Sequence, residues 1–301
     1  MYFFGKNARD YVSFARTGMI LIVVMGLIRF VVGISGAPYE RTTNLVSMSI
    51  LTLLLFVVYG QKAAATGFGT YRHLLPTAFA LSVSMYGFII LAILTEGLTG
   101  LHGYFHVHTL NALAESGQVP QGMDPTLMNV PTHIAGQLLA MVPVTFLGWG
   151  LASLGFLLSP YLAFLRNAFL LLAGLAVVRI VIGAAGVPQA IGTWVSSLTL
   201  LVLVLTVCYG YFAPFKGFDR YWQAIPIGLL MAVVVNLIIM SSTVITTSLM
   251  IPNYFQPLDQ PIGGEVQAHL RGMVIGIVPL SLLAGIGFAL GKRRALKAIV
   301  P

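Results

Sequence analysis

Charged residues are scarce in this chain, and acidic residues are the scarcest. Only 8% of its 301 residues are charged, with 8 Asp and Glu against 16 Lys and Arg, whereas soluble domains carry about 25% charged residues. Hydrophobic residues make up 58% of the sequence, and the mean hydropathy is +0.93. This composition excludes an ordinary soluble domain and indicates an integral membrane protein.

The sequence also lacks the motifs of several enzyme classes. It contains no Walker motif, no HExxH and no Ser/His/Asp arrangement, so ATP hydrolysis, zincin proteolysis and serine hydrolysis have no support. The single cysteine, Cys208, cannot form a disulfide within the chain. Glu96 is the only acid within an apolar segment, which disfavours proton-driven transport. We therefore favour a non-enzymatic role.

Eight apolar segments are each long enough to cross a hydrocarbon core of about 30 Å as a helix. They predict an all-α integral membrane protein with eight transmembrane helices. The segments cover residues 14–36, 44–60, 76–98, 133–158, 166–186, 194–212, 224–248 and 269–291.

An internal repeat accounts for the number of these segments. Residues 26–94 align with residues 176–244 at a constant offset of 150, without a gap. The match resumes at an offset of 136, where His133 falls on His269. Repeats at a fixed offset indicate duplication of a structural unit. The duplicated unit here contains four apolar segments.

Four crossings return the chain to the side of the membrane on which it started. We therefore predict two parallel tandem repeats of four helices, residues 14–158 and 166–291, related by a pseudo-two-fold axis along the membrane normal. A long outer loop, residues 99–132, lies in the first repeat. The boundary between the repeats is expected to be a short cytoplasmic turn around Pro160.

Basic residues are concentrated on one side of this topology. By the positive-inside rule that side is the cytoplasm, which places both termini there and the protein in the plasma (inner) membrane. Residues 1–13 are predicted to be a cytoplasmic interfacial segment that forms a short helix, and residues 292–301 a basic cytoplasmic tail. Lipid headgroups account for this charge, so we expect no nucleic-acid partner. The basic residues on that side are Lys6, Arg9, Arg16, Lys62, Arg72, Arg166, Lys216, Arg220, Lys292, Arg293, Arg294 and Lys297.

Two arginines occur inside apolar segments at matching positions of the repeat, Arg29 and Arg179. An arginine within a span costs on the order of 3 kcal/mol, so it indicates a functional role. We predict that this pair binds an anion or a lipid headgroup. The alternative is that each side chain extends to the interface or binds the protein's own carbonyls. Small residues on the same helix faces predict close helix packing there: Gly33, Gly36, Gly183 and Gly186.

Histidines suggest two further sites. His133 and His269 begin the fourth and eighth apolar segments, where two imidazoles near a two-fold axis could hold haem or a metal ion. The outer loop contains His102, His106 and His108, whose spacing is compatible with a divalent metal. The alternatives are interfacial or capping histidines in the first case and an amphipathic interfacial segment in the second.

Hydroxyl residues crowd one end of the seventh apolar segment. Ser241, Ser242, Thr243 and Thr246 have no equivalents in the first copy, and they are candidates for lining a polar cavity. Alternatively, their hydroxyls donate to carbonyls one turn earlier in the same helix, which needs no cavity.

Three functions are compatible with these features. The first is a membrane carrier or complex subunit, without enzymatic activity, that holds an anionic or amphipathic molecule or lipid between its repeats. The second is a redox subunit that binds haem or a quinone. The third is a structural or assembly subunit. In each case the expected partners are membrane lipid and other membrane or periplasmic subunits.

Overall fold

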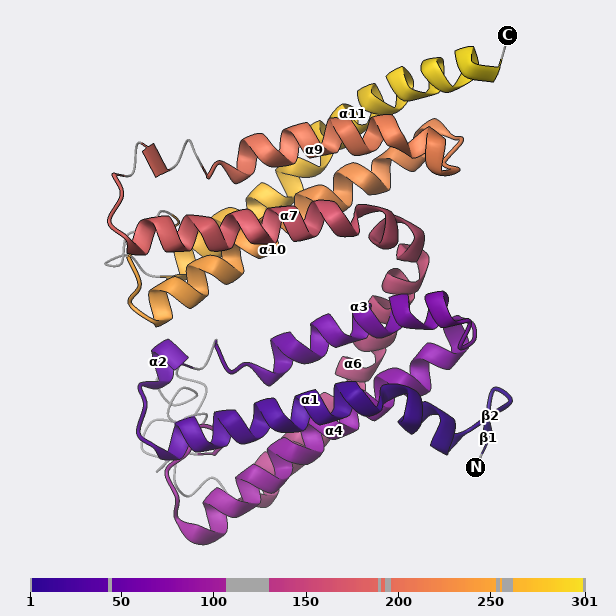
Figure 1. The fold of residues 1–301 in the computed structure, drawn as a ribbon. Helices are drawn as coiled ribbons and strands as arrows, with labels where there is room; N and C mark the ends of the chain where they lie inside the picture. The colour runs from indigo at the N-terminus through magenta and orange to yellow at the C-terminus, as the bar shows by residue number, and fades with distance from the viewer. Residues whose placement is uncertain are drawn as a thin grey trace. The chain divides into compact units, whose positions relative to one another are not determined.

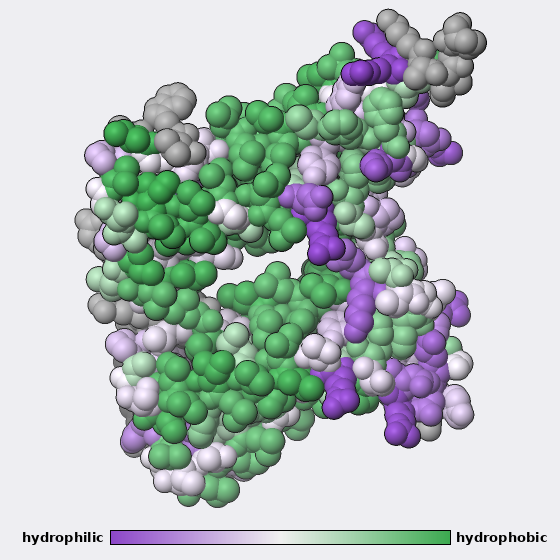
Figure 2. All heavy atoms as spheres, viewed as in Figure 1, coloured by the Kyte–Doolittle hydropathy of each residue, from purple (hydrophilic) through white to green (hydrophobic). Residues whose placement is uncertain are grey.

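The structure is a computed structural model that describes residues 2–42, 45–106, 130–188, 191–192, 196–252, 255 and 262–299. The chain divides into two compact units, Met1–Ser159 and Pro160–Pro301. Eight helices in the described residues are long and apolar enough to span a membrane, which confirms the prediction of an all-α multi-pass membrane protein. Figure 2 shows apolar side chains along the helices of each unit and hydrophilic ones gathered toward the helix ends.

The helices follow the predicted segments and extend beyond most of them (Figure 1). Those of the first unit are α1 (Ala8–Ile34), the short α2 (Tyr39–Thr42), α3 (Met48–Thr66), α4 (Tyr71–Thr99) and α6 (Val130–Leu157). Those of the second are α7 (Ser159–Ala184), α9 (Leu198–Phe212), the 3-10 helices η2 (Ala213–Lys216) and η3 (Tyr221–Gln223), α10 (Ala224–Ser248) and α11 (Ile262–Ile299).

The connection between α6 and α7 is shorter than the turn predicted around Pro160. Helix α6 ends at Leu157 and α7 begins at Ser159. Pro160 therefore lies in the first turn of α7, where the missing N–H of a proline would have had no helical partner. The proline is thus part of the start of α7 and does not form a turn between the two helices.

Residues 2–7 form a β-hairpin where the sequence predicted the start of a short interfacial helix, while residues 8–13 of that segment are helical as the first turns of α1. Strand β1 (Tyr2–Phe3) pairs with β2 (Lys6–Asn7) in antiparallel register. The two turn residues, Phe4 and Gly5, have φ values of 50° and 85°. A two-residue turn with both φ positive matches the right-handed twist of the strands. Asn7 then caps α1, because its side chain accepts from the N–H of Arg9.

Helix packing in the first unit depends on close backbone contact. A Cβ atom added to Gly60 of α3 would overlap the carbonyl oxygen of Ala152 in α6. One added to Gly155 of α6 would overlap the carbonyl oxygen of Val57 in α3. Small residues at such contacts allow helices to approach closely in lipid, where no hydrophobic force drives them together. The α3–α6 contact is therefore specified by glycines that the repeat comparison did not single out for packing.

The same contacts recur inside the second unit. Gly210 of α9 meets the carbonyl of Ala284 in α11, and Gly287 of α11 meets the carbonyl of Val207. Aromatic pairs recur as well: Tyr71 and Phe156 have ring centroids 4.8 Å apart, and Tyr221 and Phe288 have centroids 5.3 Å apart. When the contacts of the two units are compared, one partner is always displaced by 150 positions: Gly60 and Gly210, Val57 and Val207, and Tyr71 and Tyr221.

On the last helix of each unit, however, the equivalent residues lie 132 positions apart: 152 and 284, 155 and 287, 156 and 288. The sequence alignment used 136, which paired His133 with His269. Helices α6 and α11 are both continuous. At an offset of 132, His269 falls on Gln137, about one helical turn from its match with His133 in the sequence alignment.

Two of the four glycines predicted to pack helices have another role. Gly36 and Gly186 have φ values of 76° and 73°, with no atom within 4 Å of an added Cβ. They end their helices in a left-handed conformation that suits glycine. Gly33 is buried, but the backbone N of Tyr104 lies 2.9 Å from an added Cβ, so Gly33 accommodates the segment 101–106 instead of another helix. Gly183 is buried in α7.

Candidate functional site

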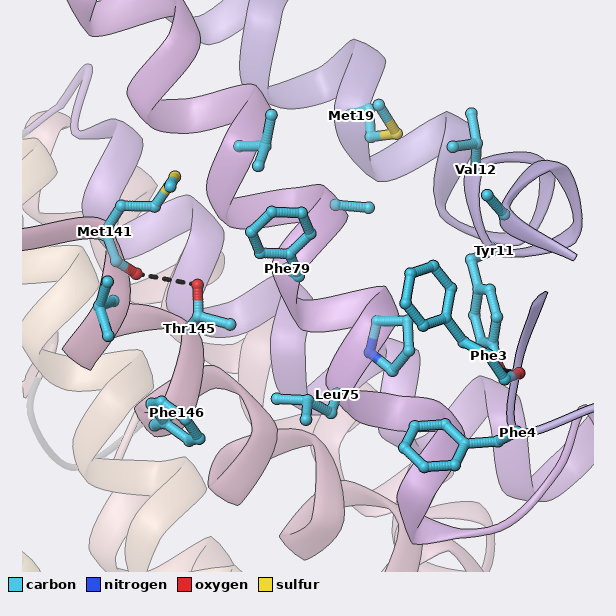
Figure 3. Close-up of a pocket in the computed structure, with 15 residues that line it drawn as sticks. Phe3, Phe4, Tyr11, Val12, Met19, Leu75, Phe79, Met141, Thr145 and Phe146 are labelled. Carbon is cyan, nitrogen blue, oxygen red and sulfur yellow. Dashed lines mark hydrogen bonds between the residues drawn. The ribbon is translucent and has the colours of Figure 1, made fainter. Parts of the chain in front are cut away.

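An apolar groove of about 820 Å³ lies in the first unit, between α1, α4 and α6. Figure 3 shows its labelled side chains directed toward a common space, with Phe3 and Tyr11 on one side, Met141 and Phe146 on the other and Phe79 between them. The lining residues are Phe3, Phe4, Ala8, Tyr11, Val12, Met19, Leu75, Pro76, Phe79, Ala80, Val83, Met141, Val142, Thr145 and Phe146.

The groove offers its contents almost no hydrogen-bonding groups. Its two polar side chains are both engaged locally. The Thr145 hydroxyl donates to the carbonyl of Met141 at 2.8 Å, as the dashed line in Figure 3 shows. The Tyr11 hydroxyl donates to the carbonyl of Phe3 at 2.8 Å. A polar solute would lose its hydration in this space without compensation, whereas hydrocarbon would lose nothing.

The N-terminal hairpin covers one end of the groove, and α1 and α4 hold it there. Tyr11 binds the Phe3 carbonyl, and His73 Nε2 lies 3.0 Å from the carbonyl of Phe4. His73 Nδ1 accepts from the backbone N–H of Thr70 at 3.0 Å, so the proton of a neutral imidazole is on Nε2 and is donated to Phe4. Phe4 lies in the turn of the hairpin with a positive φ, and its side chain lines the groove.

A second cluster of polar residues lies at the opposite end of α4. Glu96 is only 2% exposed. Its carboxylate oxygens accept from two backbone N–H groups, that of His106 at 2.7 Å and that of Phe105 at 3.3 Å. A Cβ atom on Gly103 would collide with the same carboxylate. Residues 101–106 therefore fold back onto the end of α4 around Glu96.

This fold brings two histidines together. His106 Nδ1 lies 3.2 Å from His133 Nδ1, the rings stack with centroids 5.5 Å apart, and both residues are buried. The amide of Gln137 lies 3.2 Å from His133 Nε2. One Nδ1 must carry a proton and the other must accept it. Burial lowers the pKa of His106 below its ordinary value of 6.5.

The predicted metal site on the outer loop is only partly described. His102 is exposed and His106 is buried, so the two differ in environment, and His108 lies outside the described residues. Among the residues with described positions, no group of three His, Cys, Asp or Glu side chains is arranged to hold a metal ion. The sequence proposal of haem or metal between His133 and His269 concerns residues of different units; within its own unit His133 contacts His106.

Arg29 and Arg179 are half-buried, and each lies close to aromatic rings or a ring of its own unit. The Arg29 guanidinium is 5.4 Å from the ring of Phe105 and 5.9 Å from that of Tyr104. The Arg179 guanidinium is 4.9 Å from the ring of Phe255 and donates to the carbonyl of Ser196 at 3.3 Å. The hydrogen bond from Arg179 to Ser196 is of the kind that the alternative predicted, in which an arginine binds the protein's own carbonyls. The cation–π contacts add an attraction between each guanidinium and rings of its own unit.

The hydroxyl cluster of α10 is used mainly within its helix. Ser242 donates to the carbonyl of Ile238 and Thr246 to that of Ser242, both at 2.8 Å. Thr243 is 1% exposed, and its hydroxyl has no hydrogen-bond partner in the described part of the chain. Ser241 is exposed. None of the four lines the groove, which belongs to the other unit.

Sequence reasoning missed the groove and the contact between His106 and His133. The groove combines residues from four segments, and no motif links them. The two histidines are 27 positions apart, in a loop and a helix, so no helical spacing relates them.

Comparison with known proteins adds no constraint on either site: no family model, no curated protein and no solved structure matches this chain.

Proposed function

We propose that this multi-pass membrane protein binds the hydrocarbon part of a membrane lipid in the groove of its first unit, and that it acts as a non-enzymatic carrier or complex subunit. The observation that carries the proposal is the apolar groove of about 820 Å³, with both of its hydroxyls engaged locally. This volume falls within the range of roughly 300–1,000 Å³ that is typical of ligand sites.

This groove differs from an ordinary lipid-facing surface because it is concave and because the N-terminal hairpin covers one of its ends. In a bilayer the hydrophobic effect does not favour protein over lipid, since the surrounding chains are equally apolar. A retained lipid must therefore gain from packing inside a concave wall. The hairpin provides such a wall at one end, because Phe3 and Phe4 are held over the groove by Tyr11 and His73.

We also propose that the two units arose by duplication and that both chain termini are cytoplasmic. The recurrence of helix contacts and of left-handed glycines at fixed offsets supports two parallel repeats with the same orientation in the membrane. The distribution of basic residues supports cytoplasmic termini and a plasma (inner) membrane location. In this orientation the hairpin end of the groove faces the cytoplasm.

Filling the groove should displace its lipid. Ala80 of α4 is partly buried and lines the groove, so Ala80→Phe would occupy the space with a ring. The matched control is Ala65→Phe, which places the same ring at an exposed position of α3. We expect native mass spectrometry of detergent-purified protein to show lipid retained by the parent and Ala65→Phe, and at least a fivefold lower occupancy in Ala80→Phe.

A lipid with a photoreactive group on its acyl chain provides an independent readout. It should label the peptides that contain Phe79 and Met141 in the parent protein, and this labelling should fall in Ala80→Phe. Equal lipid retention and equal labelling in the two alanine variants would contradict the proposal. Both variants must keep the elution volume and melting temperature of the parent, so that misfolding does not account for the loss.

A further inference from the structure

We infer that the hairpin end of this groove binds the anionic phosphate headgroup of a phospholipid through Arg9, Arg16 and Arg72. This inference rests on the proposed function, because it assigns the polar part of the ligand whose hydrocarbon occupies the groove. None of the three residues was singled out as a ligand-binding candidate by its position in the repeat.

On α1, two arginines lie beside the residues that line the groove. Arg16 is four positions after Val12 and three before Met19, and Arg9 is three before Val12. Residues three or four apart on a helix are neighbours on its surface, with Cβ atoms about 5–6 Å apart. The lining stripe of α1 is therefore bordered by guanidinium groups near the start of the helix.

Helix α4 contributes the third arginine from the facing wall. Arg72 is in the first turn of α4, three and four positions before Leu75 and Pro76, which both line the groove. The stripe continues through Phe79 and Val83. Since α1 packs against α4, cations from both walls lie at the same end of the groove. An amphipath with its chains along Phe79 and Met141 would have its headgroup at this end.

Unlike Lys6, Lys62 and Arg29, these three arginines have no partner within the described residues. All three are exposed, and their guanidinium groups make no hydrogen bond or ion pair there. By contrast, Lys6 lies 4.7 Å from the ring centroid of Phe68, and Lys62 donates to the carbonyl of Phe14 at 3.2 Å.

The nearest acid in sequence is Asp10, which sets one negative charge against the three positive charges of the arginines. Asp10 accepts from the backbone N–H of Asn7 at 2.9 Å, which completes the cap of α1. The arginine cluster therefore keeps an excess of positive charge. A guanidinium presents a planar fork of donors that matches the oxygens of a phosphate. Three of them favour a phosphate headgroup with net negative charge over a zwitterionic headgroup, whose own cation offsets the phosphate.

The test compares ligands that differ only in the headgroup. Purified protein is titrated with phosphatidic acid, with phosphatidylcholine of the same chains, and with inorganic phosphate. We expect phosphatidic acid to bind at least tenfold more tightly than phosphatidylcholine, since each arginine near an anionic lipid contributes about fivefold. Inorganic phosphate should neither bind measurably nor compete at millimolar concentration; competition would show a site for free phosphate and overturn the assignment to lipid.

A charge-matched pair of triple variants tests the residues. Arg9→Gln with Arg16→Gln and Arg72→Gln should reduce phosphatidic acid binding to the level of phosphatidylcholine and leave phosphatidylcholine binding unchanged. The control replaces three exposed cations of the second unit by glutamine: Arg166, Arg220 and Arg293. The control should retain at least half of the preference. An equal loss in both triples would overturn the inference, because net charge alone would then explain the preference.

The outcomes separate this inference from the proposed function. If Ala80→Phe displaces both lipids but the arginine triple keeps the preference for phosphatidic acid, the headgroup assignment is wrong and the groove stands. If Ala80→Phe displaces neither lipid, the groove itself is not the site. Each triple is compared with the parent by melting temperature, and single variants replace a triple that fails to fold.

Discussion

Glu96, His106 and His133 show how individual polar residues stabilise the segment 101–106 against the end of an apolar helix. A carboxylate in the last turn of α4 faces the negative end of the helix dipole, which is unfavourable. Two backbone N–H groups compensate it, at 2.7 and 3.3 Å. The imidazoles of His106 and His133 then share one proton between their Nδ1 atoms. A second proton would place two N–H groups face to face.

The protonation of His106 should weaken this cluster in mildly acidic solution. Burial lowers the pKa of His106 below 6.5, so the folded state binds a proton less readily than the unfolded chain. Its contribution to stability is therefore complete above pH 6.5 and is lost as the pH falls below that value. We expect the melting temperature to decrease between pH 7.5 and 5.5, and we expect His106→Gln to show a smaller decrease.

His102 provides the control for this measurement, because it is exposed on the same segment. His102→Gln should retain the pH dependence of the parent protein. If His102→Gln and His106→Gln have the same pH profile, titration of the buried histidine is not the cause of the change.

At the scale of elements, glycine determines which helices can touch. The α3–α6 contact places the backbone of Gly60 against the carbonyl of Ala152. The interior of such a contact is close-packed and yields little to added volume. Gly87 of α4 is the opposite case, because no atom lies within 4 Å of an added Cβ.

These two glycines predict opposite effects of the same substitution. Gly60→Ala should lower the free energy of unfolding by about 1–3 kcal/mol, because the helices must separate to accommodate the methyl group. Gly87→Ala should be neutral or stabilising by up to about 1 kcal/mol, because alanine favours the helix and nothing obstructs it. Chemical denaturation in detergent measures both variants. Similar free energies of unfolding would mean that the close α3–α6 contact does not form.

The elements that could be predicted from the sequence are those with a long apolar signal. Eight segments of suitable length predicted eight helices, since the bilayer sets the length of a span. The hairpin was missed because its signal is short: a two-residue turn with positive φ at Phe4 and Gly5. Aromatic and basic residues at the start of the chain suit an interfacial helix equally well.

Sites formed by tertiary contact could not be predicted in the same way. Thr145 and Met19 line one groove, but their sequence positions share no motif with each other. The pairing of His133 with His269 rested on identical residues alone. Matching histidines, glycines and prolines favoured an offset of 136, whereas the packing residues of α6 and α11 are related by 132. Packing contacts determine helix register more strongly than a few identical residues do.

At the scale of the whole molecule, the offsets of 132 and 150 relate positions that hold different residues in the two units. In the first unit a Cβ added to Gly148 would lie 2.5 Å from the ring of Phe56. At the equivalent positions of the second unit, 280 and 206, the residues are Leu280 and Thr206, both buried. The large side chain is on α3 in one unit and on α11 in the other.

This exchange predicts a double substitution that transplants the second unit's solution into the first. Gly148→Leu alone should clash with the Phe56 ring, and Phe56→Thr alone should leave a cavity, each at a cost of about 2–4 kcal/mol. Together the leucine should fill the space that the phenylalanine vacates, and the new hydroxyl can donate to the carbonyl one turn earlier, as Thr206 donates to Val202 at 2.6 Å.

A double-mutant cycle measures whether the two changes compensate. We expect the double variant to be more stable than the sum of the single variants predicts, by at least about 1.5 kcal/mol. The control cycle uses Gly148→Ala with Phe56→Thr, because an offset of 136 would make Ala284 the counterpart of Gly148. Alanine is too small to fill the cavity, so this pair should compensate less. Additive costs in the first cycle, or stronger compensation in the second, would contradict the offset of 132 and with it the equivalence of α6 and α11 on which the duplication argument depends.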